Sequence, residues 1–185
     1  MSPERSMPKL DWEISRYQGT AECPIGQIQE LRRLCWPSIS AAGESLEDGF
    51  DEGAWHWTVR SEHRLIAAAR LTIHNDLIHI PEAHLFRHIV SHPLPRPIGY
   101  ISRLIIHPEA RRNGLSRTLD HCRLEACREL GVKSLIVNWT PQSGVHRKRQ
   151  LMELGFQSPD GDAPHPDGAF GVSYIYWMPL SAIAI

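Results

Sequence analysis

The sequence predicts an α/β domain in which a central mixed sheet of six to seven strands carries helices on both faces. Three observations lead to this class. The 185-residue length suits one domain with a sizeable core. The apolar run Ile98–Ile106 is too continuous for an edge strand, so we place it centrally. A helical pattern and a second short apolar run follow it, and this strand–helix–strand unit is expected to be parallel with a right-handed crossover.

The first half of the chain divides into a tail and an antiparallel front of the sheet. Residues 1–9 are expected to form a flexible tail, and residues 10–185 the single domain. Apolar residues spaced three and four apart predict a helix over 25–36, stopped by Pro37. We expect strands over 12–18, 55–60 and 65–74, the last two as a hairpin, then a short helix over 81–90 and a proline-rich loop over 91–97.

The second half follows the central strand. An apolar stripe (Leu115, Leu119, Cys122, Ala126 and Leu130) predicts a helix that ends at Gly131. A buried strand is expected over 134–138, a basic helix over 144–154 ended by Gly155, and a loop over 158–171. An alternating strand over 172–178 closes the sheet.

Composition limits the partners and the compartment. A net charge of −1 gives no general attraction to nucleic acid or acidic membranes, so neither is expected as a partner. No apolar stretch approaches the roughly 18–20 residues of a membrane span, and the N-terminus lacks an apolar signal core. Four cysteines without CxxC spacing favour reduced thiols in the cytoplasm. A homodimer is compatible with this composition.

The most informative segment is the run Arg111-Arg112-Asn113-Gly114-Leu115-Ser116. It forms a basic, glycine-containing loop between the central strand and the next predicted helix. The first turn of a helix offers unpaired N–H groups and the positive end of the helix dipole, which together bind phosphate. Gly114 removes a Cβ where a ligand approaches the backbone, and Arg117 adds further positive charge.

This run resembles the acyl-CoA-binding motif [QR]-x-x-G-x-[GA] of the GNAT superfamily of N-acetyltransferases, with Ser116 as a small residue in the last position. The later Leu154-Gly155-Phe156 is similar to the family's common L-G-F ending. The resemblance covers residues 98–156. It implies that acetyl-CoA or another acyl-CoA is the cosubstrate, bound by the loop from Arg111 to Arg117. It also implies that the backbone of Leu104, Ile105 and Ile106 holds the pantetheine arm and polarises the thioester carbonyl.

The resemblance does not extend to the residue that usually serves as the catalytic acid in this family. Many GNAT enzymes carry a tyrosine in Y-x-x-L-G-F, and here that position is Leu151. His146 is a candidate acid, against the alternative of an exposed helix histidine. His107 is a loop histidine beside the expected cofactor. A water held by Ser102 or Asn138 is a candidate base.

Other features are weaker. His84 and His88 have helical spacing but no H-E-x-x-H pattern, so no metal is expected. The acidic stretch 44–52 indicates either a cationic acceptor or a solvated surface loop. Trp139, after the end of a parallel strand, is either a core residue or part of the acceptor pocket.

These observations predict an acyl-CoA-dependent N-acyltransferase, most simply an acetyltransferase, acting by direct attack of a primary amine of a small molecule or peptide. Two alternatives stay open. One is a long-chain acyltransferase similar to acyl-homoserine-lactone or N-acyl amino acid synthases, which share the pattern Ala69-Arg70-Leu71. The other is a CoA-binding module without catalysis, which the leucine at position 151 favours.

Overall fold

The computed structural model describes residues 11–37, 46, 48–89, 94–159, 163–167 and 171–180. Seven strands form one sheet in the order β1-β2-β3-β4-β5-β7-β6. The strands are β1 (Trp12–Gln18), β2 (Trp55–Ser61), β3 (Arg64–His74), β4 (Ile98–Ile106), β5 (Ser134–Trp139), β6 (His165–Asp167) and β7 (Gly171–Pro179). The α-helices are α1 (Ile25–Cys35), α3 (Leu115–Glu129) and α4 (Val145–Glu153). Four 3₁₀ segments complete the described elements: η1 (Leu77–His79), η2 (Ala83–Ile89), η3 (Pro108–Ala110) and η4 (Pro141–Ser143).

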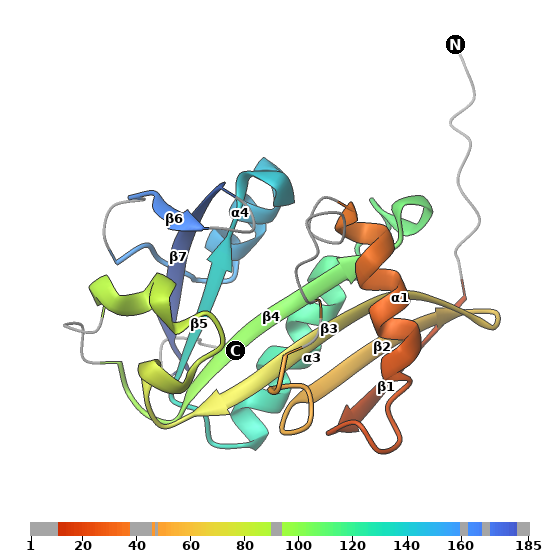
Figure 1. Ribbon diagram of the computed structural model, residues 1–185, viewed down its shortest axis with the longest axis horizontal. Coiled ribbons are helices and arrows are strands. Elements are labelled where there is room, and N and C mark those ends of the chain that lie inside the picture. Colours follow the sequence, from red (N-terminus) through yellow and green to blue (C-terminus); the bar gives the residue numbers. More distant parts are fainter. Residues whose placement is uncertain are drawn as a thin grey trace, which may run out of the picture.

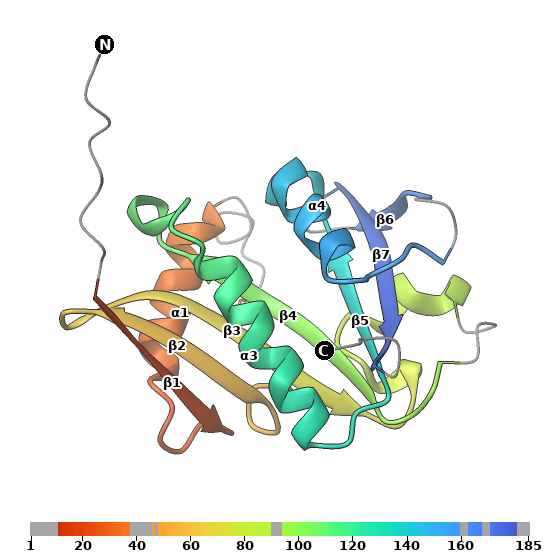
Figure 2. The ribbon, with the colours of Figure 1, turned by 180° about the vertical axis from the view of Figure 1, so that it is seen from behind.

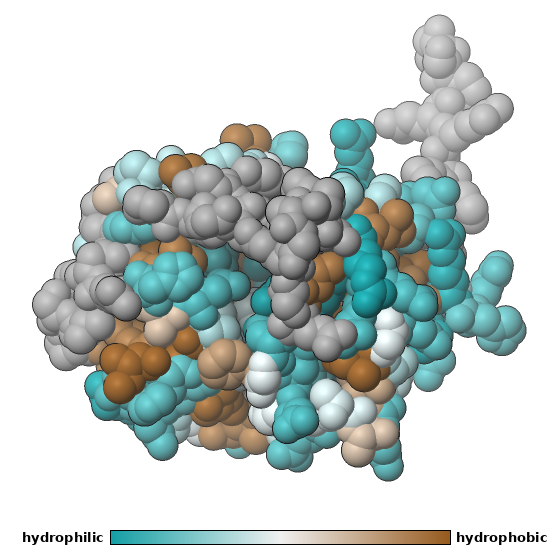
Figure 3. All heavy atoms as spheres, viewed as in Figure 1, coloured by the Kyte–Doolittle hydropathy of each residue, from teal (hydrophilic) through white to brown (hydrophobic). Residues whose placement is uncertain are grey.

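Helices cover both faces of the sheet, as the sequence predicts. Figure 1 shows α1 in front of β2 and β3, and Figure 2 shows α3 on the opposite face, with α4 beside β5. On the α1 face, hydrophilic and hydrophobic residues are interspersed (Figure 3). The expected tail at residues 1–9 lies outside the described residues. No helix among the residues described above is long and apolar enough to cross a membrane.

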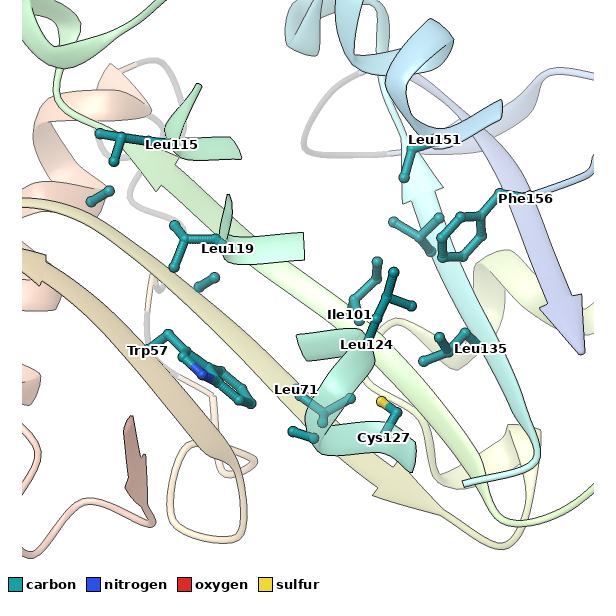
Figure 4. Close-up of a cluster of buried hydrophobic side chains, with 14 of the residues drawn as sticks. Trp57, Leu71, Ile101, Leu115, Leu119, Leu124, Cys127, Leu135, Leu151 and Phe156 are labelled. Carbon is teal, nitrogen blue, oxygen red and sulfur yellow. The ribbon is translucent and has the colours of Figure 1, made fainter. Parts of the chain in front are cut away.

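Three core clusters follow from this layering. The main core lies between the sheet and α3 and α4, where Leu115 and Leu119 approach β3 and β4 while Leu151 and Phe156 lie beside β5 (Figure 4). On the opposite face, one cluster packs η1 and η2 on β4, β5 and β7, and another packs α1 on β3 and β4. Between these last two clusters the sheet carries buried charges, described below.

The sequence predictions need two corrections. Leu115, Leu119 and Ala126 of the stripe expected on α3 are buried, but Leu130 is 36% exposed and Cys122 is only partly buried. Cys127 and Arg123, which lie outside that stripe, are fully buried. The helix therefore presents a salt-bridged face to the protein as well as an apolar one. The segment 158–171, expected as a loop, contributes the short strand β6, which pairs with β7. The central position of β4 and its parallel pairing with β5 are confirmed.

The feature that positions the site is the separation of β4 from β5. The two parallel strands pair over three positions, Ile98 to Tyr100 opposite Ser134 to Ile136. Beyond Tyr100, β4 continues for six residues with its other side paired to β3, and β5 continues beside β7. Figure 1 shows the two strands diverging toward the ends that carry α4 and the loop after β4. The sheet therefore contains a wedge lined by unpaired strand backbone.

Candidate functional site

The backbone of β4 offers donors to this wedge. The N–H of His107 points to β3, where it donates to the carbonyl of Ile66 at 2.8 Å. Because successive N–H groups of a strand point to opposite sides, those of Ile106 and Leu104 point away from β3, into the wedge. The Ile106 carbonyl is engaged within the protein, because it accepts hydrogen bonds from Cys35 Sγ at 3.4 Å and Arg111 Nε at 3.3 Å.

A β-bulge lies in the middle of β4. Ala68 pairs with Ile105 and Arg70 with Ser102, so Arg103 and Leu104 together lie opposite the single residue Ala69. Arg103 has a φ of 54°, which this irregularity requires. As a result, Ser102 and Arg103 both point to the α1 face, although they are consecutive.

The loop after β4 has the backbone shape of an anion site. Arg112 and Gly114 both have left-handed backbone, with φ of 66° and 80°. A Cβ on Gly114 would meet no atom within 4 Å, so the space beside it is open. Gly114 provides no side-chain cap to α3, and the first ordinary helical bond runs from the N–H of Thr118 to the Gly114 carbonyl. The N–H groups of the first turn are thus free for an external acceptor.

The side chains of this loop have different roles. Leu115 is buried in the core, and Asn113 Nδ2 donates to the Ala110 carbonyl, which fixes the turn. Ser116 Oγ donates to Gln150 Oε1 at 2.9 Å, and Arg117 forms an ion pair with Glu153. Both contacts connect the loop to α4. Among the predicted cofactor residues, Arg111 and Arg112 are therefore the exposed side chains that are available to a phosphate, and Gly114 contributes its backbone.

A fully buried carboxylate joins α3 to α4. Asp120 has no exposed surface and forms ion pairs with Arg123 and Arg147, and it accepts from Gln150 Nε2 at 2.5 Å. Burial by itself raises the pKa of Asp120, but the charges of Arg147 and Arg123 outweigh it and the net pKa is lowered. Arg123 also donates to the carbonyls of Arg70 and Ser102, each at 3.3 Å. One network thus extends from the loop to the bulge of β4.

The candidate acids and bases lie in different surroundings. His146 is exposed at the start of α4. Leu151 is fully buried in the main core. The position of the tyrosine in the Y-x-x-L-G-F pattern therefore holds no ionisable group in this chain. Ser102 Oγ accepts from Arg70 Nε at 3.2 Å on the α1 face. His107 is buried, with Nε2 2.5 Å from an Arg64 nitrogen.

Asn138 belongs to a polar cluster that the sequence did not reveal. Tyr100, fully buried in β4, donates its hydroxyl to Glu82 Oε2 at 2.7 Å, and the same hydroxyl lies 3.1 Å from Asn138 Oδ1. Asn138 Nδ2 donates to Glu82 Oε2 at 3.2 Å. Burial, and then the negative charge of Glu82, raise the pKa of Tyr100 well above its ordinary value.

Two aspartates of the acidic stretch 44–52 turn inward, whereas Glu52 is exposed and residues 44, 45 and 47 lie outside the described part of the chain. Asp51 pairs with Arg32 and Arg70, and Asp48 pairs with Arg70 and Arg103. Burial raises the pKa of Asp51, but Arg32 and then Arg70 outweigh it and bring the pKa to about 2. These two carboxylates are therefore neither a solvated loop nor free to bind a cationic acceptor. The sequence signal for this network was Arg70, a lone charge inside an apolar strand.

Trp139 is 8% exposed and packs in the main core, with its ring 5.1 Å from that of Tyr174 and Nε1 donating to the Gly144 carbonyl. The described residues contain no group of three or more His, Cys, Asp or Glu side chains that suits a metal ion.

The diverging parallel strands β4 and β5, the loop at Gly114 and the helix α3 that follows it are the features of a GNAT-like acyltransferase fold. The sequence model of the Acetyltransferase (GNAT) family matches residues 25–156, and the chain belongs to this family. A comparison with curated proteins gives no significant match.

Solved structures with the same fold are distant in sequence. An acyl-CoA N-acyltransferase from Pseudomonas aeruginosa is 15% identical, with a TM-score of 0.66 over 90% of this chain and 99% of that one. FeeM, an N-acyl amino acid synthase from uncultured soil microbes, is 12% identical, with a TM-score of 0.64 over 93% of both chains. An acetyltransferase from Bacillus subtilis in complex with CoA is 12% identical, with a TM-score of 0.58 over 91% of this chain and 99% of that one. At these identities the likeness shows the fold.

Proposed function

We propose that the protein transfers an acyl group from acyl-CoA, most simply acetyl-CoA, to a primary amine of a small molecule or peptide. The observation that carries this proposal is the wedge between β4 and β5, with the open left-handed loop at Gly114 beside it. In this proposal the first-turn N–H groups of α3 bind the pyrophosphate, with Arg111 and Arg112 adding charge. The pantetheine arm lies in the wedge as an added strand.

The backbone of β4 supplies the electrostatics of the reaction. The N–H of Leu104, directed into the wedge, is placed to donate to the thioester carbonyl oxygen, where negative charge develops as the amine attacks. The amine forms the C–N bond, the C–S bond breaks, and CoA leaves as a thiolate. Because Leu151 offers no proton, the amine nitrogen or solvent supplies the proton that the sulfur takes up.

A long-chain acyl donor is the second candidate, supported by the likeness to FeeM over 93% of both chains. The test is CoA release, measured with acetyl-CoA and with a long-chain acyl-CoA against 2-phenylethylamine, spermidine and L-amino acids. Amine-dependent release with either donor supports acyl transfer, and the preferred donor chooses between the two candidates. Thermal stabilisation by CoA without release for any amine would favour the non-catalytic module.

A further inference from the structure

One carboxylate stands where β4 and β5 separate. Tyr100 is the last residue of β4 that pairs with β5, and Asn138 lies on β5 two residues beyond the last pair. Both side chains converge on Glu82, which is half-exposed in the segment between η1 and η2. The Glu82 carboxylate is thus held at the vertex of the wedge by one residue from each diverging strand.

The cluster lies on the side of the sheet opposite α3. Tyr100 packs with Phe86 of η2, their rings 5.4 Å apart and edge to face, and belongs to the core cluster on the η1–η2 side. The loop at Gly114 leads into α3, which covers the other face. A cofactor arm in the wedge and a second substrate arriving from the α1 side would therefore meet near this carboxylate.

Glu82 differs chemically from the other carboxylates near β4. Asp48 and Asp51 are paired with arginines, and Asp120 with two more. Guanidinium pairing stabilises the ionised carboxylate and makes it a poor proton acceptor. The described partners of Glu82 are a neutral phenol and a neutral amide, and both donate to the same oxygen, Oε2. Oε1 receives no donor from these two side chains.

The backbone at Glu82 supports a positional role. Its φ is 61°, in the left-handed region that non-glycine residues rarely adopt. The N–H of Leu85 donates to the Glu82 carbonyl at 2.9 Å and holds this turn. Such a conformation persists where the surrounding structure fixes it, and residues of this kind concentrate at functional sites.

We propose that Glu82 is the catalytic base of the acyl transfer and takes a proton from the acceptor's ammonium group at the vertex of the wedge. The inference rests on the proposed function. The ammonium loses one proton to Glu82, which passes it to solvent, and the neutral amine forms the C–N bond to the thioester carbon. When the C–S bond breaks, the second proton on nitrogen goes to the departing sulfur, giving amide and CoA. Tyr100 and Asn138 are positioning residues that aim the carboxylate.

The test compares kcat/KM against pH for the wild type and Glu82→Gln, with acetyl-CoA and the best amine of the panel. General bases contribute about 10²–10⁴-fold, so we expect a loss of at least about 100-fold near pH 7. The difference in kcat/KM between the wild type and Glu82→Gln should decrease as the pH rises toward the pKa of the amine, because the amine is then already neutral. Tyr100, the ionisable group that contacts Glu82, also experiences the charges of Arg70 on β3 and Arg103 on β4, and all three residues are retained in this variant.

Two variants and one ligand measurement complete the design. Glu82→Asp keeps a carboxylate and should exceed Glu82→Gln by at least tenfold, whereas equal rates would overturn the proposal. Glu125→Gln removes the same charge from the exposed side of α3 and should behave as wild type. Thermal stabilisation by acetyl-CoA should be unchanged in Glu82→Gln, since the carboxylate does not hold the cofactor.

The outcomes separate the two proposals. Wild-type turnover, with Glu82→Gln within threefold of it and an unaltered pH profile, would remove Glu82 as base and leave acyl transfer intact. A wild type that is stabilised by acetyl-CoA but acylates no amine would overturn acyl transfer and the base with it. Loss of acetyl-CoA stabilisation in Glu82→Gln would assign this residue to structure and also overturn the proposal.

Discussion

Arg123 of α3 donates a hydrogen bond to the backbone carbonyl of Ser102 in β4, 3.3 Å away. Ser102 immediately precedes the bulge, where the ladder between β3 and β4 is interrupted. Buried carbonyls need hydrogen-bond donors, and this buried arginine donates to the carbonyls of Ser102 and of Arg70, which is the partner of Ser102 on β3. The helix that begins at the candidate phosphate loop therefore also fixes the strand that lines the wedge.

The first prediction concerns Gly114. Gly114→Glu places a bulky anion where we expect the pyrophosphate, so thermal stabilisation by acetyl-CoA should be lost. Gly131→Glu is the matched control, because Gly131 also has a left-handed φ of 70° and open space beside it. Both variants should lose a similar stability, about 1–2 kcal/mol, from the backbone conformation. Equal acetyl-CoA stabilisation in the two variants would refute the loop's role.

The second prediction concerns charge. Arg111→Ala and Arg112→Ala should each weaken CoA binding by about ten- to hundredfold, since a charge-assisted contact contributes roughly 1.5–3 kcal/mol. Affinity should also fall with added salt. Arg128→Ala, at the exposed far end of α3, is the control and should bind CoA as the wild type does. Isothermal titration at two ionic strengths measures both effects, and salt-independent affinity would contradict a phosphate contact.

The third prediction concerns His146. Because this histidine is exposed at the start of α4, His146→Ala should lose less than the roughly 100-fold typical of removing a general acid or base. The measurement is kcat and kcat/KM against pH with an accepted amine. A loss above about a thousandfold, with one limb of the profile removed, would make His146 the acid or base.

The fourth prediction concerns Asp120. Removing this fully buried carboxylate leaves Arg123 and Arg147 without their common partner, and breaking a buried ion pair typically costs about 3–5 kcal/mol. Asp120→Ala should lower the free energy of unfolding by about that amount in urea titrations. Glu129→Ala, which breaks the exposed ion pair with Arg16, should cost at most about 1 kcal/mol. Similar losses in both variants would show that burial of the network is unimportant.

The fifth prediction concerns acid sensitivity. Burial, and then the charges of His79 and Arg70, lower the pKa of His74 to about 4 from an ordinary 6.5. The unfolded chain therefore binds the proton first, so the stabilising effect is complete above about pH 6.5 and is lost as the pH falls toward 4. His74→Gln should flatten the decline in unfolding free energy between pH 7 and 5. An unchanged slope would mean that His74 does not contribute.

The sequence predicted the frame of the fold because periodicity and glycine positions are local signals. The run from Ile98 to Ile106 and the helix after Gly114 are both where the patterns put them. It did not predict β6, because a three-residue strand in a Pro- and Gly-rich stretch has no measurable periodicity. It also misread α3, because Asp120 and Arg123 look like a solvated face until their partners on α4 and β4 are known.

The candidate site was also predicted only in part. Motif spacing located the loop. The cluster at Glu82 was not predicted, because Tyr100 lies 18 positions from Glu82 and 38 positions from Asn138 along the chain. Nothing in the sequence near Glu82 marks it, since a single glutamate before a short helix is common. The packing of the η1–η2 segment over β4 and β5 brings these side chains together.

The short pairing between β4 and β5 determines how firmly the two halves of the sheet are connected. Three residue pairs hold one half of the sheet, β1 to β4, to the other, β5 to β7. Past those pairs each half ends in an internal edge with open backbone groups, and an extended ligand that bonded to both would complete the ladder as an eighth strand does. Amide hydrogen exchange along the part of β4 that does not pair with β5 would then slow on ligand binding, so the exchange rate would report whether the wedge is occupied.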